Sequence, residues 1–258
     1  MFVFKYLIVL CTVFFIRKSS SVVILNKCDI ADSSCKIYVY RGLIQSVARG
    51  EPEKKIPAID PLSLKNITIS LPKNLQFTLV DVIGKGLKDC SFDDLKTDID
   101  HRYTILNITC NIDFDGQFKF FVPNEVISEL GGSGDGDEFS GKGKLKIEKM
   151  HFNFDFPFAV VKKNGEIYLQ VRYHDGLGVW SRVNGTTQFS SDDLDLGDNF
   201  LNNKLIALLN EYSKEIEDSV VSMINLRMNE FYHAFCDWFF DSVPANNFIT
   251  RDLTPYVN

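Results

Sequence analysis

Side chains that could carry out catalysis or bind a metal are few and scattered in this sequence. His101, His151, His174 and His233 stand far apart, and the sequence has no His-Glu-x-x-His pair of the kind that binds zinc. Ser133 lacks the glycine two positions later that a nucleophile elbow requires. A catalytic group assembled only by the fold remains an alternative. These spacings nevertheless favour a protein that is not an enzyme and that holds no metal or cofactor.

The glycine-rich segment 131–138 could bind phosphate or calcium. It lacks the Gly-Lys-Ser/Thr ending of a phosphate loop and the alternating ligands of a calcium loop. We therefore predict a surface loop.

The N-terminal segment has the order of a secretory signal peptide. Lys5 precedes an apolar run over residues 7–16, and small residues follow at 19–21. A membrane anchor is the alternative, but the run is shorter than the roughly 20 residues that cross a bilayer. We expect residues 1–21 to be a signal peptide, and residues 22–258 to form a single secreted domain.

The cysteines agree with an oxidising compartment, where such residues form disulfides rather than catalytic thiols. Cys28 and Cys35 enclose a short loop before a predicted helix. Cys90 and Cys110 lie symmetrically about a predicted turn over residues 97–102, so a hairpin would bring them together. We predict these two disulfides and an unpaired Cys236.

Three sequons point to the same compartment, and the net charge limits the possible partners. Asn-x-Ser/Thr sequons predict glycans at Asn66, Asn107 and Asn184. Without residues 1–21, which contain three basic and no acidic residues, the chain has 25 basic and 34 acidic side chains and a net charge of −9. Such a charge argues against nucleic acid or an anionic membrane surface as the main partner.

The spacing of apolar residues changes twice along the mature chain. Apolar residues at helical spacing predict a first helix capped by Ser33 or Ser34 and ended by Gly50. Between residues 67 and 173 apolar and polar residues alternate, which predicts antiparallel strands with one buried face. The phase changes near residues 148–149, where we expect a β-bulge.

The last third predicts one long helix over residues 203–241. Apolar residues recur there at steps of three and four, and Pro244 ends the pattern. Such a helix would be roughly 55–60 Å long, whereas a compact domain of this size has a radius of gyration of about 18 Å. The molecule should therefore be elongated along the helix. A coiled coil is the alternative, but no second heptad repeat accompanies this helix.

Several segments of the mature chain have a recognisable order and spacing: Cys28-x6-Cys35, Ile44-Gln45, Ala48-Arg49-Gly50-Glu51-Pro52, Ile56-Pro57-Ala58-Ile59-Asp60-Pro61-Leu62 and Leu209-Asn210-x-Tyr212-x-x-Glu215-Ile216. With these segments the whole mature chain resembles the insect takeout and juvenile hormone-binding protein family, the takeout branch more than the hormone-binding branch. The resemblance implies an α+β fold in which a strongly curved antiparallel sheet wraps a long helix. It also implies a lengthwise apolar tunnel for terpenoid or fatty-acid-like ligands. The hormone-binding branch has a disulfide between the late sheet and the long helix that Cys236 cannot form here.

These observations favour a secreted, non-catalytic carrier of a small lipophilic ligand. A protein that acts through a receptor or a microbial lipid surface, without an internal ligand, is the alternative. The 22 phenylalanines supply apolar surface, although any single one of them is more simply explained as core. We predict a ligand site between a phenylalanine-rich strand, the long helix and the end of the first helix, with the Tyr212 hydroxyl available to a ligand carbonyl. Its predicted contacts are Leu43, Ile44, Val47, Phe152, Phe154, Phe156, Phe158, Leu209, Tyr212, Ile216, Val220 and Ile224.

Overall fold

The computed structural model of the chain describes residues 26–132, 137–194 and 199–257. The predicted signal peptide, Ser133 and the middle of the glycine-rich segment lie outside these ranges. Within them, no helix is both long enough and apolar enough to cross a membrane.

Two long central strands organise the sheet, which has eight antiparallel strands in the described part of the chain. They are β4 (Tyr103–Val122) and β5 (Asp137–Lys163), paired along most of their length. β3 (Ser91–Asp98) pairs with the first half of β4, and β2 (Gln76–Lys85) pairs with its second half. β1 (Leu62–Ser70) extends the sheet beyond β2.

The other edge of β5 is covered by three short strands, one after another. β8 (Thr187–Leu194) pairs with the first part of β5. β7 (Gly178–Val183) pairs with its middle, and β6 (Glu166–Val171) pairs with its end. The sheet is therefore long and narrow, as an elongated molecule requires.

The alternating pattern places the apolar face of the strands inside, as predicted, and the bulge near residues 148–149 is confirmed. Cys110 lies opposite Met150, whereas Ile112 lies opposite Ile147, so β5 contains one extra residue. Lys149 takes a positive φ of 52° there, and its backbone N–H donates to the Asn111 side-chain oxygen at 2.9 Å. A bulge increases the local twist and bends its strand, which contributes to the curvature of the sheet.

In the described part of the chain, the helices are α1 (Ser33–Val47), α2 (Asn124–Glu129), α3 (Asn199–Glu211) and α4 (Ser213–Ser242). Six single-turn 3-10 helices lie between the larger elements: Pro52–Lys54, Pro72–Asn74, Leu87–Asp89, Tyr173–Asp175, Ala245–Asn247 and Thr254–Tyr256.

Two details of the helices differ from the prediction. The N-cap of α1 is Asp32, whose carboxylate accepts the Cys35 backbone N–H at 2.9 Å, and not Ser33 or Ser34. The predicted continuous helix over residues 203–241 is interrupted at Tyr212, which has a non-helical ψ of 20°. The apolar spacing runs through this break without a change, so the hydrophobic period alone could not reveal it.

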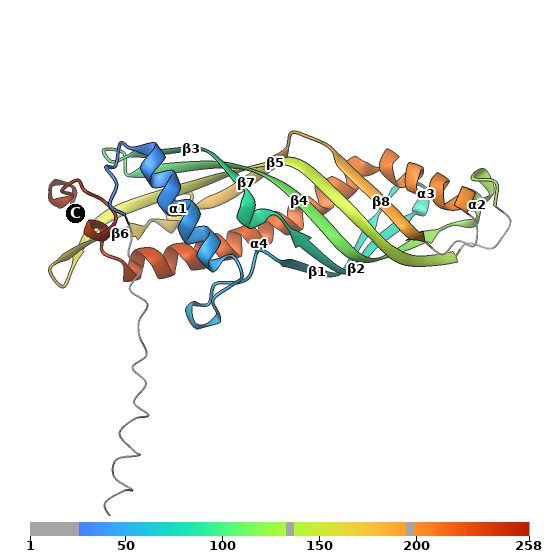
Figure 1. The fold of residues 1–258 in the computed structure, drawn as a ribbon, viewed down its shortest axis with the longest axis horizontal. Helices are drawn as coiled ribbons and strands as arrows, with labels where there is room; N and C mark the ends of the chain where they lie inside the picture. The colour runs from blue at the N-terminus through green and yellow to red at the C-terminus, as the bar shows by residue number, and fades with distance from the viewer. Residues whose placement is uncertain (1–25, 133–136, 195–198, 258) are drawn as a thin grey trace, which may run out of the picture.

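The elements form an elongated body, as predicted (Figure 1). The sheet curls over α4, which lies along the long axis of the molecule. α1 covers one end, beside the C-terminal segment, and α2 and α3 lie at the other end.

Both predicted disulfides are confirmed. Cys28 and Cys35 are joined with their Cα atoms 5.6 Å apart. Cys90 and Cys110 are joined with their Cα atoms 4.4 Å apart, across the predicted hairpin of β3 and β4. Cys236 is unpaired and buried within α4.

Candidate ligand-binding cavity

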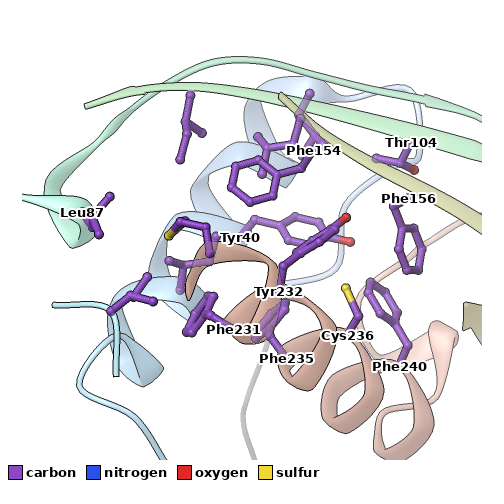
Figure 2. A pocket seen from close by; sticks show the side chains of 16 residues that line it. Tyr40, Leu87, Thr104, Phe154, Phe156, Phe231, Tyr232, Phe235, Cys236 and Phe240 are labelled. Carbon is purple, nitrogen blue, oxygen red and sulfur yellow. The ribbon is translucent and has the colours of Figure 1, made fainter. Parts of the chain in front are cut away.

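An apolar cavity lies inside the end of the molecule that carries α1, between α1, the C-terminal half of α4 and the concave face of the sheet (Figure 2). The cavity is narrow, with a volume of about 40 Å³. The lining residues are Tyr40, Ile44, Ile59, Leu87, Leu95, Thr104, Leu106, Ile108, Phe154, Phe156, Met228, Phe231, Tyr232, Phe235, Cys236 and Phe240.

The helical wall of the cavity comes from one face of α4. The lining residues of α4 follow one another at steps of one, three and four, which places them on one side of the helix. They begin with Met228, Phe231, Tyr232 and Phe235. They cover two aromatic rings of β5. Phe154 meets the Tyr232 ring edge-on, with the ring centroids 5.0 Å apart. These contacts form a largely aromatic wall.

The buried carboxylate of Asp60 stabilises the turn at the apolar end of the cavity. Asp60 is only 4% exposed. Its Oδ2 accepts the backbone N–H groups of Gly86 and Lys88, each at 2.9 Å. Leu87 lies between these two donors and projects into the cavity (Figure 2). Asp60 therefore fixes the turn that presents Leu87.

The few polar atoms of the cavity are uncharged. Burial raises the pKa of the Cys236 thiol and of the Tyr40 and Tyr232 hydroxyls, so all three groups stay protonated at neutral pH. Both tyrosine hydroxyls point toward the side of the cavity where Thr104 and Phe156 lie (Figure 2). The cavity is thus apolar near Leu87 and has hydroxyl groups toward its other side, an arrangement that suits an amphiphilic ligand better than a charged reaction intermediate.

Three of the predicted ligand contacts line this cavity, namely Ile44, Phe154 and Phe156. The others belong to the surrounding core. Tyr212 is half-buried at the break between α3 and α4. The remaining eight are all buried outside the cavity lining: Leu43, Val47, Phe152, Phe158, Leu209, Ile216, Val220 and Ile224. A ligand contact at any of these nine residues stays a prediction.

The predicted site and this cavity share strand β5 but involve different parts of the last third of the chain. The prediction names residues 209–224 there, whereas the cavity lies against residues 228–240. One signal in the sequence could have indicated this, because aromatic residues are concentrated between positions 231 and 240. Toward the other end of the molecule, four phenylalanines pack against one another. They are Phe77, Phe118, Phe120 and Phe189, with ring centroids 5.1–5.5 Å apart.

The histidines lie away from the cavity. His101 pairs with Asp98, with Nδ1 and Oδ2 2.7 Å apart, on the surface. His151 lies 3.6 Å from the Asp93 carboxylate on the outer side of the sheet. The described residues contain no group of three or more His, Cys, Asp or Glu side chains that could hold a metal ion.

Two of the predicted glycosylation sites are exposed, Asn66 and Asn184. Asn107 lies on the polar face of its strand but is half-buried, and its Oδ1 accepts the Asn153 side-chain amide at 2.8 Å. Because Asn107 is half-buried and the other two are exposed, Asn66 and Asn184 are the better candidates for a glycan.

The profile of a protein family described as haemolymph juvenile hormone binding protein matches residues 6–250. The chain belongs to this family. The family resemblance inferred from the cysteine and proline spacing is therefore confirmed. A search of curated protein sequences found no match.

A solved structure of another protein agrees with this assignment at the level of the fold. The crystal structure of Takeout 1 from Epiphyas postvittana is similar, with a TM-score of 0.64 and 19% identity, over 87% of this chain and 99% of that one. The fold is thus a curled antiparallel sheet around a long C-terminal helix. The structure of lipopolysaccharide binding protein is more distant, with a TM-score of 0.42 and 14% identity, over 84% of this chain and 39% of that one.

Proposed function

We propose that this protein is a secreted, non-catalytic carrier that binds a small lipophilic ligand in the cavity between α1, α4 and the sheet. The observation that carries the proposal is the lining of this cavity, which consists of apolar and aromatic side chains with a few polar groups and no formal charge. Apolar walls with few polar groups are typical of small-molecule sites.

The chemistry of the walls favours a terpenoid or a fatty acid. Each methylene group moved from water into such a cavity contributes about 0.8 kcal/mol, so a long chain can offset the entropy lost on binding. The cavity is narrow, and the ligand must therefore displace side chains as it enters. Phe154 and Tyr232 meet edge-on across it, and their rotation would widen the space between sheet and helix.

Secretion is supported by the predicted signal peptide and by the two disulfides, which persist in oxidising compartments. Expression with the natural leader in cultured insect cells tests this part of the proposal. We expect the protein in the medium, with an N-terminus near residue 22 and a mass that falls on treatment with an N-glycosidase. Retention of the intact chain inside the cells would contradict secretion.

Mass spectrometry of an organic extract tests the carrier function directly. The protein secreted by those cells should release a lipophilic molecule in near-stoichiometric amount, and the stripped protein should bind a fluorescent fatty acid or terpenoid. A protein that carries no lipid and binds neither probe would favour the alternative, an extracellular interaction protein without an internal ligand.

A further inference from the structure

A second cavity adjoins the first and contains a buried lysine. It has a volume of about 30 Å³ and shares Tyr40, Thr104 and Phe156 with the larger cavity. Lys36 lines the second cavity and lies one helical turn before Tyr40 on α1. The two side chains therefore project from the same face of α1, with Tyr40 at the junction of the two cavities.

The ammonium group of Lys36 has only neutral oxygen atoms as partners. Lys36 is 8% exposed, and its Nζ donates to the Ile30 carbonyl at 2.6 Å and to the Thr97 hydroxyl at 2.9 Å. The Thr104 hydroxyl donates to the Thr97 oxygen at 3.1 Å. No carboxylate of the described residues lies within 4.0 Å of Nζ, and its third N–H has no partner among them. Asp29, Asp32 and Asp94 act on it only from longer range.

A buried cation without an anionic partner is unfavourable, because the protein interior replaces hydration poorly. Burial accordingly lowers the pKa of Lys36. Lys36 could simply connect the Ile30 carbonyl to β3. A neutral hydrogen-bond donor would be enough for that role, so the role does not explain why a positively charged side chain is buried here. An anionic group placed in the second cavity would provide the missing partner.

We propose that Lys36, together with the hydroxyl of Thr97 that Thr104 holds in place, binds the carboxylate of a long-chain amphiphile whose hydrocarbon chain occupies the larger cavity. This assignment rests on the proposed carrier function and adds the chemical class of the ligand, a fatty acid or another long-chain carboxylic acid. Tyr40 lines both cavities and therefore lies at the junction between chain and head group. The carboxylate would accept the third N–H of Lys36 as a charge-assisted hydrogen bond.

Oleate and oleyl alcohol are suitable probes, because they share a hydrocarbon chain and differ in the head group. A cavity with only neutral partners would favour the alcohol, since desolvation of a carboxylate is costly. We expect the unmodified protein to bind oleate at least tenfold more tightly than oleyl alcohol in competition with a fluorescent fatty acid at pH 8. Equal binding, or a preference for the alcohol, would overturn the head-group site and leave the carrier function intact.

The variant Lys36→Met removes the charge and keeps an apolar stem of similar length. We expect it to weaken oleate binding at least tenfold and to change oleyl alcohol binding less than threefold. Lys144→Met is the matched control, because Lys144 is an exposed lysine on β5 that lines neither cavity, and it should change neither affinity. An equal loss for both probes in Lys36→Met would show that Lys36 is only structural and would overturn the assignment.

A second variant and the comparison of the two probes distinguish failure of the head-group site from failure of the carrier function. Thr97→Val retains the lysine and removes one hydroxyl of the head-group site, so it should weaken oleate and leave oleyl alcohol unchanged even if Lys36→Met fails to fold. A protein that binds neither probe would refute the carrier function, and the head-group site with it. Binding of the alcohol alone refutes only the head-group site.

Discussion

Two isoleucines of β4 allow the position of the cavity to be tested with one substitution. Ile108 and Ile112 both face the interior, and they are 4% and 0% exposed. Only Ile108 lines the cavity. In Ile112→Phe the larger ring has no free space to enter, and overpacking of this kind costs about 1–3 kcal/mol of unfolding free energy. In Ile108→Phe the ring can extend into the cavity, so we expect a loss below about 1 kcal/mol.

Ligand binding should respond in the opposite way to stability, because the variant that loses less stability should lose more affinity. The cavity is narrow, so one additional ring at position 108 would occupy space that the ligand needs. We expect Ile108→Phe to weaken binding of a fluorescent fatty acid at least tenfold, which corresponds to about 1.4 kcal/mol. Ile112→Phe should bind the probe within threefold of the unmodified chain.

Urea denaturation gives the stability of each variant, and titration with the fluorescent probe gives its affinity. The two measurements together separate loss of space from loss of folding. If Ile108→Phe is the less stable variant and binds the probe as well as the unmodified chain, the ligand does not occupy this cavity.

Three further predictions concern the elements around the cavity. Replacing Cys90 and Cys110 by alanine should cost about 3 kcal/mol, because their disulfide closes a loop with a sequence separation of 20; an unchanged urea midpoint would contradict this. Asp60→Ala should lower the free energy of unfolding by about 2–4 kcal/mol, because two backbone N–H groups beside Leu87 lose a buried carboxylate acceptor. Urea denaturation measures this loss, and an unchanged midpoint would contradict it. Cys236 should resist iodoacetamide at pH 8 until urea unfolds the chain, because burial raises the pKa of its thiol; rapid alkylation of the folded protein would refute this burial.

The sequence predicts the sheet well because the strands obey a local rule. Residues that alternate along β4 and β5 become buried and exposed in turn, and the change of phase at residues 148–149 marks the bulge. The Cys90–Cys110 disulfide could be predicted for the same reason, since it spans one hairpin. These features depend on neighbours in the chain or on one adjacent strand.

Features that depend on distant segments could not be predicted in this way. The interruption at Tyr212 leaves the apolar period intact. Lys36 is polar and precedes the predicted apolar stripe of α1, yet Ile30 and Thr97 enclose it. The location of the cavity depends on which side chains fill the space between sheet and helix. At the α3 end, Phe189 and its aromatic neighbours fill that space.

The two ends of the molecule differ in how their aromatic rings pack. Four phenylalanine rings pack against one another at the α3 end. At the α1 end, the rings of α4 and β5 surround free space. This difference predicts that a ligand enters only one half of the long apolar interior and that the other half serves as core.

Photolabelling with a fatty acid that carries a diazirine in its hydrocarbon chain tests the location of the ligand most directly. After irradiation, peptide mapping should find the label on α4 between Met228 and Phe240 and on β4 between Thr104 and Ile108, where the cavity walls lie. An excess of unlabelled oleate should abolish the labelling. Label confined to the cluster around Phe118 and Phe189, or spread over the outer surface without competition by oleate, would contradict a carrier that holds its ligand between α1, α4 and the sheet.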